Sequence, residues 1–281
     1  MTVPTLDLND GTTIPQLGFG VFQVPAEETK ATVLQAFEAG YRHIDTAQMY
    51  QNEQGVGEAI AESGLPREDI FVTTKLNNGL HRPDDARRSL DQSLELLGLD
   101  HVDLFLIHWP LPTRYDGDYV STWQTLVDLR DAGKTISAGV SNFQPDHLDR
   151  IVSETGVAPV VNQIEVHPYF AHDYARGASH RHNALVEAWS PIAQGAVLDD
   201  AVLTDLAGEL DRTTAQVALR WHVQRGDIIF PKSVNAKRMK QNFEIFDFEL
   251  STDQMQAISD LDRGEEGRRG PNPDEMDVIP D

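Results

Sequence analysis

Three short apolar strands of this chain end on side chains that can act together on a carbonyl group. Asp45 closes the run HID, Lys75 comes at the end of VTTK, and His108 follows VDLFLI. Tyr50 lies on the loop five residues after Asp45. A carboxylate, an ammonium, an imidazole and a phenol can protonate a carbonyl oxygen while hydride reaches its carbon. The spacing therefore predicts a proton-donating site where strands run into loops.

Tyr50 is the expected proton donor of this set. A free tyrosine titrates near pH ~10, so its phenol is a weak acid at neutral pH. A lysine ammonium beside the phenol favours the tyrosinate and improves the donor, which is the role expected for Lys75. Asp45 would keep that ammonium charged and oriented. His108 would donate to the carbonyl oxygen and direct it toward Tyr50.

Taken singly, each of these residues also has a purely structural explanation. Asp45 can cap a helix, and Lys75 can be a surface lysine. His108 can be a core histidine, and Tyr50 can be a half-buried aromatic. A metal site on Asp45 and His108 is a further rival, but the chain has no HExxH or comparable spacing. The coincidence of all these residues at strand ends favours catalysis without a metal.

Apolar runs alternate with helical patterns along the whole chain and predict the elements that must position this set. Apolar strands joined by helices, such as Pro83–Leu97 and Thr213–Gln224, indicate a parallel sheet. Eight such units without a composition break predict one α/β domain, a closed (β/α)8 TIM barrel over residues 1–281. An open doubly wound sheet is the alternative, but no G-x-G-x-x-G follows the first strand. The expected strands are Leu17–Gly20, His43–Asp45, Phe71–Lys75, Val102–Ile107, Ile136–Val140, Val160–Ile164, Leu185–Ala188 and Ile228–Phe230.

Two segments lie outside this repeat. Thr5–Ile14 alternates around Asn9-Asp10-Gly11, which is a strong signal for a β-hairpin. From Asp262 onward the sequence DRGEEGRRGPNPDEMDVIPD is dominated by glycine, proline and charge, which predicts a loop. A disordered tail is the alternative for this last segment.

Composition limits the partners and the location of the protein. The 281 residues carry a formal net charge of −22, which disfavours nucleic acids and anionic membranes as partners. No apolar run reaches the ~18 residues of a membrane span, and the N-terminal residues show no signal region. Cysteine is absent, which removes disulfides and thiolate metal sites. We expect a cytoplasmic monomer whose partner is a small carbonyl substrate.

The segment IIFPKSVNAKRMKQN is the strongest candidate for binding a nucleotide. Its strand ends at Pro231, and Lys232, Ser233 and Arg238 precede or open a helix. Backbone N–H groups at a helix N-terminus favour an anion, and a lysine, a hydroxyl and an arginine suit the 2′-phosphate of NADPH. The other interpretation is a basic helix start on an acidic protein. The phosphate sites found after strands 7–8 of such barrels favour the nucleotide.

These segments together resemble one protein family. The stretch GYRHIDTAQMYQNEQGVGE, the strand ends at Lys75 and His108, and the match from GFGVF to the PDEMD tail are similar to aldo-keto reductases. The nearest subgroup is the bacterial one that contains 2,5-diketo-D-gluconate reductases. The resemblance implies a (β/α)8 barrel, NADPH/NADP+ as the cofactor and the same roles for the four catalytic residues above. It also implies that the hairpin closes the N-terminal end of the barrel and that the tail folds over the mouth of the site.

The resemblance further implies contacts with the cofactor and the substrate. Asn142 and Gln163 would bind the nicotinamide carboxamide, and Trp189 would stack on the ring. Taken alone, each polar residue can simply satisfy loop backbone, and Trp189 can be core. The expected substrate contacts are Phe22, Tyr50, His108 and Trp109. The expected cofactor contacts are Gly20, Val21, Phe22, Asp45, Ser141, Asn142, Gln163, Trp189, Ser190, Pro191, Ile192, Gln194, Lys232, Ser233, Val234, Arg238, Gln241 and Asn242.

The chain departs from the family pattern near both ends of the expected site. Asn235 stands where many relatives carry arginine or threonine, which would weaken the grip on the phosphate. Gln241 replaces a glutamate and can still hydrogen-bond an adenine as a neutral group. Asn77-Asn78 stands in place of a tryptophan, which removes one aromatic wall of the pocket.

A third departure lies where a regular helix is expected, in YFAHDYARGASHRHNALVEAW. Gly177 would cost about 1 kcal/mol relative to alanine inside a helix. His180 and His182 are two residues apart, so they do not share a helical face. We expect both histidines at the surface rather than at a metal.

An NADPH-dependent reductase of aldehydes and ketones is the function that these features favour, with α-dicarbonyls and keto-sugars as candidate substrates. A nucleotide-binding regulatory barrel with little turnover is the alternative, but binding alone does not require Tyr50 together with His108. A barrel enzyme that uses the phosphate site for a sugar phosphate is a third hypothesis. Gln163 and Trp189 argue against it, because a sugar phosphate has no need of a nicotinamide site.

Overall fold

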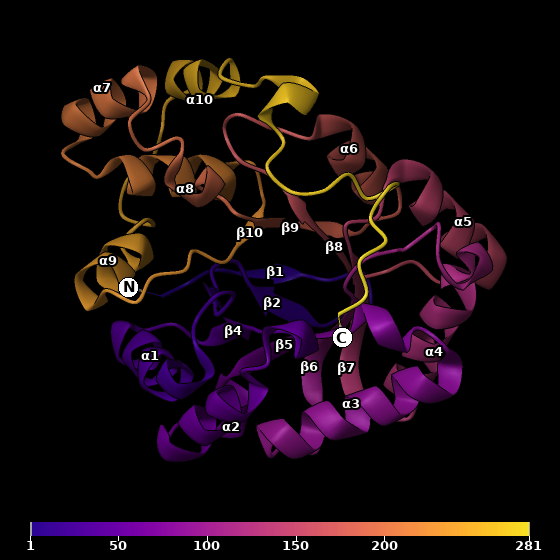
Figure 1. The fold of residues 1–281 in the computed structure, drawn as a ribbon. Helices are drawn as coiled ribbons and strands as arrows, with labels where there is room; N and C mark the ends of the chain where they lie inside the picture. Colours follow the sequence, from indigo (N-terminus) through magenta and orange to yellow (C-terminus); the bar gives the residue numbers. More distant parts are fainter. Residues whose placement is uncertain (1, 281) are drawn as a thin grey trace.

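The computed structural model describes residues 2–280, and its central feature is a parallel sheet closed into a barrel (Figure 1). Within these residues the sheet has eight strands, each hydrogen-bonded to the next along the chain. A parallel bridge between Leu17 and Ile229 joins the first strand to the last. The (β/α)8 architecture predicted from the sequence is confirmed. The strands are β3 (Phe19–Gly20), β4 (His43–Asp45), β5 (Phe71–Leu76), β6 (Val102–Ile107), β7 (Thr135–Ser141), β8 (Val161–Glu165), β9 (Leu185–Trp189) and β10 (Ile228–Ile229).

Helices cover the outside of the barrel (Figure 1), and α3 illustrates how the sequence forms them. Pro83 lies in its first turn, and Gly98 ends it in the left-handed conformation with φ 66°. Leu90, Leu94 and Leu97 recur at helical spacing and are buried. Among residues 2–280, none of the helices combines the length and apolarity needed to cross a membrane. The helices are α1 (Ala26–Ala39), α2 (Glu53–Glu62), α3 (Pro83–Leu97), α4 (Tyr119–Asp131), α5 (Pro145–Thr155), α6 (Asp173–Arg181), α7 (Ala201–Leu210), α8 (Thr214–Gln224), α9 (Ala236–Phe243) and α10 (Thr252–Ser259).

Most predicted boundaries agree with the structure closely, and the differences have local causes. β4, β6 and α3 have the expected bounds. α8 starts one residue later than expected because Thr213 is its N-cap and forms a capping box with Gln216. β3 starts at Phe19 rather than at Leu17, since Leu17 makes the single bridge to Ile229 instead.

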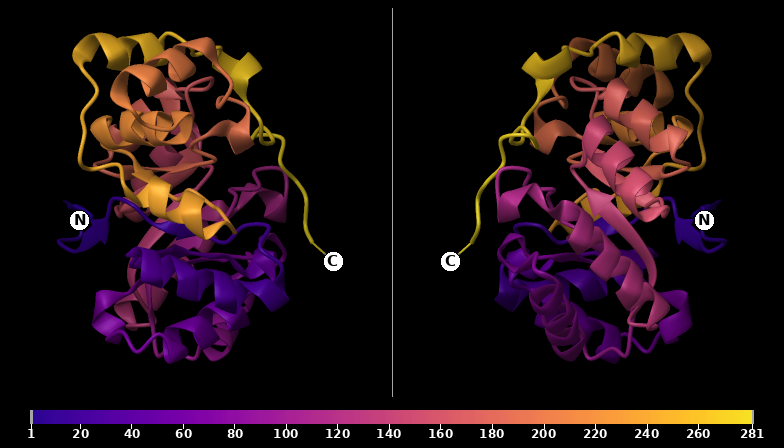
Figure 2. Two further views of the ribbon diagram at one scale, coloured as in Figure 1. Left: turned by 90° about the vertical axis from the view of Figure 1, so that its left-hand side faces the viewer. Right: turned by 90° about the vertical axis from the view of Figure 1, so that its right-hand side faces the viewer.

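The predicted hairpin forms and closes one end of the barrel. β1 (Thr5–Asp7) pairs antiparallel with β2 (Thr13–Pro15). Leu8 and Ile14 are buried against apolar side chains from inside the barrel, including Phe230. Figure 2 shows this hairpin on the side opposite the C-terminal segment, so the mouth near the strand ends stays free of it.

Residues 262–280, called the C-terminal strap below, run across the other end of the barrel (Figure 2). The buried carboxylate of Glu165, at the end of β8, accepts hydrogen bonds from the backbone N–H groups of Arg269 at 2.7 Å and Gly270 at 2.9 Å. Farther along, the Asn78 side chain donates to the carbonyl oxygen of Val278 at 2.9 Å. The predicted loop over the mouth is therefore held at both of these points.

The helix expected around Gly177 forms despite the cost of this glycine, and α6 runs through it from Asp173 to Arg181. Ser179, which is buried, donates its hydroxyl to the carbonyl oxygen of Ala175 at 2.9 Å and so has its polar group satisfied within the helix. His180 is exposed and His182 is partly exposed, as expected for surface residues.

Gly57 and Gly177 should respond in opposite directions to replacement by alanine. A Cβ added to Gly57 in α2 would lie 2.7 Å from the Cα of Leu97 and would collide with the Leu97 carbonyl group. Gly57→Ala should therefore destabilise the fold by about 1–3 kcal/mol. A Cβ on Gly177 meets open space among the described residues, so Gly177→Ala should stabilise it by about 0.5–1 kcal/mol. Urea unfolding measures both. A Gly57→Ala variant as stable as the parent would contradict the close packing of α2 on α3.

Candidate active site

The ammonium of Lys75 lies inside the barrel at the centre of the site. Its Nζ donates to both carboxylate oxygens of Asp45 at 2.8 Å and to the carbonyl oxygen of Thr46 at 2.9 Å. Lys75 has no exposed surface. Burial lowers the pKa of the ammonium, but Asp45 and Tyr50 raise it, and the net pKa lies above the ordinary value. Lys75 is therefore a buried cation paired with a carboxylate, and the surface-lysine alternative is wrong.

Tyr50 ends the short 3-10 turn Gln48–Tyr50 that follows β4. Its hydroxyl lies 3.4 Å from Nζ of Lys75, and its ring packs on Phe22 with the centroids 5.0 Å apart. Burial raises the pKa of the phenol, and the nearby ammonium opposes this shift without cancelling it. Lys75 therefore lowers the pKa of the phenol, as expected, but burial raises it by more. The phenol is protonated at neutral pH, which is the state that a proton donor needs.

His108 directly follows β6 and faces Tyr50, with the two rings edge to face and their centroids 5.8 Å apart. Burial, the Lys75 ammonium and His81 hold the pKa of His108 well below its usual range. The imidazole is therefore neutral at pH 7 and has one N–H to offer. In the described part of the chain, its Nδ1 has no hydrogen-bond partner. A neutral donor of this kind can orient a carbonyl oxygen.

Asp45 connects Lys75 to a second polar cluster inside the barrel. It does not cap the turn after β4, which has Ala47 as its N-cap and no side-chain cap. Its Oδ2 instead accepts a hydrogen bond from Nε2 of Gln163 at 3.0 Å. The same nitrogen donates to Oε2 of Glu187 at 3.0 Å. Gln163 and Glu187 are direct neighbours on β8 and β9, so the sheet register brings these groups together.

Trp189 is tied to Asn142 across the mouth of the barrel. The indole Nε1 donates to Oδ1 of Asn142 at 2.8 Å, and Nδ2 of Asn142 donates to the backbone carbonyl of His108 at 2.9 Å. Ser141 uses its hydroxyl on the backbone carbonyl of Gln163 at 2.8 Å. The indole is only partly buried and lines a cavity, so it is not simply a core residue.

A cavity of about 720 Å³ opens above these residues. Met49 and the strap residues Arg269, Gly270 and Pro271 join its walls, whereas Asn77 does not. Of the residues predicted from the sequence, the structure brings together around it Gly20, Phe22, Asp45, Tyr50, His108, Trp109, Ser141, Asn142, Gln163, Trp189, Ser190, Pro191, Ile192, Gln194, Lys232 and Arg238. Predicted residues outside its walls are Val21, Lys75, Ser233, Val234, Gln241 and Asn242. Its wall residues that the sequence did not single out for the site are Gln23, Met49, Gly195, Leu198, Phe230, Pro231, Arg269, Gly270 and Pro271.

The start of α9 shows why part of the predicted phosphate set is turned inward. Ser233 is buried, and its hydroxyl accepts the backbone N–H of Asn235 at 3.1 Å. Asn235 is the N-cap of α9 and accepts from the N–H of Arg238 at 3.1 Å. Asparagine is among the best N-caps, so this departure from the family pattern supports the helix start. Lys232 and Arg238 are the exposed cations on this side of the cavity.

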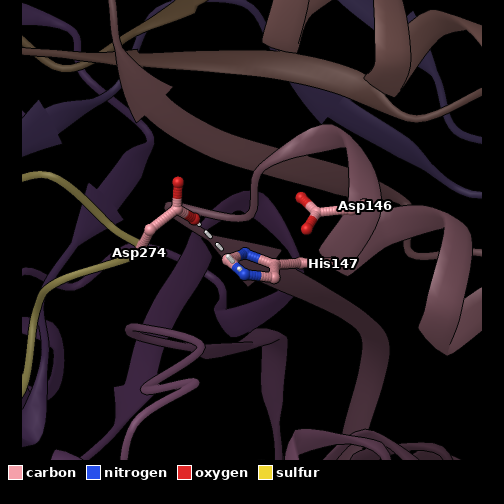
Figure 3. A group of neighbouring side chains, drawn as sticks. All are labelled: Asp146, His147 and Asp274. Carbon is pink, nitrogen blue, oxygen red and sulfur yellow. Dashed lines mark ion pairs between the residues drawn. The ribbon is translucent and has the colours of Figure 1, made fainter.

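Among the described residues, one group offers metal-type ligands (Figure 3), and none of its three residues lines the cavity. His147 faces Asp274 of the strap, with Nε2 3.5 Å from Oδ1, and Asp146 lies beside it. Nδ1 of His147 accepts the backbone N–H of Gln144. A neutral imidazole that accepts at Nδ1 carries its proton on Nε2, which is the nitrogen that faces the carboxylates. The group therefore places the His147 imidazole against the strap at Asp274.

Comparisons with known proteins show the family to which the chain belongs. Residues 16–263 match the model of the aldo/keto reductase family. An aldo-keto reductase of Mycolicibacterium smegmatis is 48% identical over 96% of this chain and 97% of its own length. The methylglyoxal reductase DkgA of Escherichia coli is 44% identical over 98% of this chain and 99% of its own length. The structure of a variant of Gox0644 in complex with NADPH superposes with a TM-score of 0.94 at 43% identity, covering 98% of this chain and 99% of that one.

The chain belongs to the aldo/keto reductase family. Its activity is the NADPH-dependent reduction of carbonyl compounds, in agreement with the class expected from the sequence. The resemblance to the bacterial subgroup also holds, since relatives named methylglyoxal reductase DkgA match at 44–45% identity.

The sequence reasoning missed two buried carboxylates, Glu165 and Glu187. Each interrupts an apolar strand, in VNQIEV and LVEAW, and a charged residue inside a buried strand is the signal that could have found them. Glu187 has no exposed surface, and burial followed by the Asp45 carboxylate raises its pKa to about 8. Glu187 therefore keeps its proton at neutral pH.

Glu187→Gln should remove a pH-dependent loss of stability. The carboxyl has a pKa of about 8 when folded, against about 4.5 in the unfolded chain. Because the folded pKa is the higher one, its contribution to stability is present below about pH 4.5 and is lost as the pH rises through about 8. Relative to Glu187→Gln, the parent should lose on the order of a few kcal/mol across that window. Urea unfolding at several pH values measures the difference.

The matched control is Glu68→Gln, which neutralises an exposed carboxylate. It should follow the parent at every pH. If Glu187→Gln also runs parallel to the parent, Glu187 does not hold a proton in the folded state.

Proposed function

We propose that Tyr50 gives the proton to the carbonyl oxygen of a small aldehyde or ketone, with the chain acting as one domain. The observation that carries this proposal is the contact of the Tyr50 hydroxyl with a buried, fully paired Lys75 ammonium at 3.4 Å. When the phenol loses its proton, the tyrosinate that forms lies beside this cation, which stabilises it. His108, held neutral, would donate to the same oxygen and keep it within reach of Tyr50.

The cofactor site follows from the walls of the cavity. NADPH supplies a hydride when bound. The exposed cations Lys232 and Arg238 suit its 2′-phosphate, because charge-assisted contacts with phosphate are strong. The partly exposed face of Trp189, held by Asn142 at 2.8 Å, would support the nicotinamide ring. Gln241 and Asn242 would reach only the outer part of the nucleotide, since neither lines the cavity.

Small α-dicarbonyls are the substrate class that we propose first, with keto-sugars second. Relatives named methylglyoxal reductase are 44–45% identical over almost the whole chain. Phe22, Met49 and Trp109 give the cavity apolar walls beside Tyr50, which suits a compact substrate. A cytoplasmic location, a monomeric state and the absence of a nucleic-acid partner stay predictions from the sequence, the last supported by the net charge of −22.

Tyr50→Phe should abolish carbonyl reduction while leaving NADPH binding nearly intact. General acid catalysis supplies about 10²–10⁴-fold, so kcat with methylglyoxal or a simple aldehyde should fall by at least that range. Steady-state rates and a cofactor titration of the same preparation measure the two effects. A variant that binds NADPH and still turns over an unactivated aldehyde at the parent rate would disprove the assignment. A parent that binds NADPH but reduces no carbonyl compound would favour the regulatory alternative.

Arg238→Ala should weaken NADPH binding more than NADH binding. Hydrogen bonds to charged groups contribute roughly 1.5–3 kcal/mol, and solvent exposure of Arg238 places the expected loss at the lower end, about tenfold in Kd. The loss for NADPH should shrink as salt is added. Lys237→Ala is the matched control, because Lys237 is exposed on the same helix but does not line the cavity. Equal effects of Arg238→Ala on both cofactors would refute the phosphate site.

A further inference from the structure

The amide of Gln163 is held in one orientation by two carboxyl groups. Its Nε2 donates to Oδ2 of Asp45 and to Oε2 of Glu187, both at 3.0 Å. An amide nitrogen has two hydrogens, so both donors of Gln163 are used inside the barrel. Gln163 is itself buried and lines the cavity.

The opposite orientation of the amide is unfavourable. Turning it over would place Oε1 against the Asp45 carboxylate, whose two oxygens accept hydrogen bonds from Lys75. Two acceptors in contact, one of them charged, repel each other in a buried site. Asp45 therefore disfavours the flipped amide, and Glu187 provides the second acceptor, without which one N–H of Nε2 would be free to turn toward the cavity.

The consequence is that Gln163 presents only an acceptor to the cavity. The hydrogen bonds found among residues 2–280 leave its Oε1 without a partner, whereas both N–H groups point to the carboxyl pair. A carboxyl group, ionised or protonated, has an oxygen that can accept from Nε2, so this arrangement does not depend on the charge of Glu187. A ligand group that pairs with Gln163 must therefore be a hydrogen-bond donor.

We propose that Glu187 is a positioning residue that fixes the Gln163 amide, so that the site selects a cofactor ring bearing an amide N–H donor. The inference rests on the proposed nicotinamide site beside Trp189. Its new content is that Glu187, one strand away and without exposed surface, acts together with Asp45 to fix which atom of Gln163 reads the carboxamide. Glu187 does not line the cavity, so its effect must pass through Gln163.

The test compares NADP+ with its 3-acetylpyridine analogue, which replaces the carboxamide NH₂ by a methyl group. The parent protein should bind NADP+ about tenfold more tightly, the usual size of one lost hydrogen bond in a buried site. Glu187→Leu removes one acceptor of the clamp and should reduce this preference to about threefold or less. Glu187→Gln keeps an oxygen that can accept from Nε2 and should retain most of the preference. Calorimetric titration of each folded variant gives both dissociation constants.

Glu187→Met, which also cannot accept a hydrogen bond of normal strength from Nε2, replaces Glu187→Leu if that variant does not fold. Gln163→Leu tests the acceptor itself and should bind the two dinucleotides with similar affinity. A merely structural role of Glu187 would weaken both ligands equally and leave their ratio unchanged.

The outcomes separate this inference from the proposed function. A parent that binds neither dinucleotide would refute the cofactor site as a whole. A parent that binds both equally, or a Glu187→Leu or Gln163→Leu variant that keeps the full preference for NADP+, would overturn the role of Glu187 while leaving the reductase intact.

Discussion

The buried pair of Lys75 and Asp45 is the interaction on which the site depends. Removing an ammonium and a carboxylate from water costs several kcal/mol per ion unless each is well paired. Here the ammonium has Asp45 at 2.8 Å and the Thr46 carbonyl at 2.9 Å, and the phenol of Tyr50 takes the remaining side at 3.4 Å. The pair needs two adjacent parallel strands, because only their register places both side chains inside the barrel. It also gives Tyr50 a fixed cation beside which a tyrosinate can form.

Asp45 also links this buried pair to the strands on the other side of the barrel interior. It accepts from Gln163 as well as from Lys75, and Gln163 in turn is clamped against Glu187. The proton-donating set and the proposed reader of the carboxamide thus share one carboxylate. Movement of Gln163 would disturb Asp45, and through it the ammonium beside Tyr50. The polar interior of the barrel is in this sense one connected network rather than two sites.

The strap adds a second connection, from the C-terminal residues to the cavity wall around Trp189. Glu165 accepts two backbone N–H groups of the strap, and Gly270 then lies so close to the Trp189 ring that a Cβ would collide with it. A buried carboxylate with several donors is well satisfied, so this end of the strap is strongly positioned. Farther along the strap, Asp274 lies against His147 of α5. The wall around Trp189 is therefore built from residues far apart in the sequence.

The sequence by itself determined the barrel, the hairpin, the three polar residues at strand ends and the place of Tyr50 on the loop after the second strand. These follow from local patterns such as apolar runs, Asn9-Asp10-Gly11 and strand-end spacing. Tertiary structure alone decided which side chains meet inside the barrel. Ser233 and Asn235 make hydrogen bonds at the start of α9. At Tyr50, burial raises the pKa of the phenol by more than Lys75 lowers it. The strap partners of the Glu165 carboxylate lie 104 and 105 positions away, and the acceptors of the Gln163 amide lie 118 and 24 positions away. Such pairings arise from the closure and register of the barrel, which no local stretch of sequence specifies.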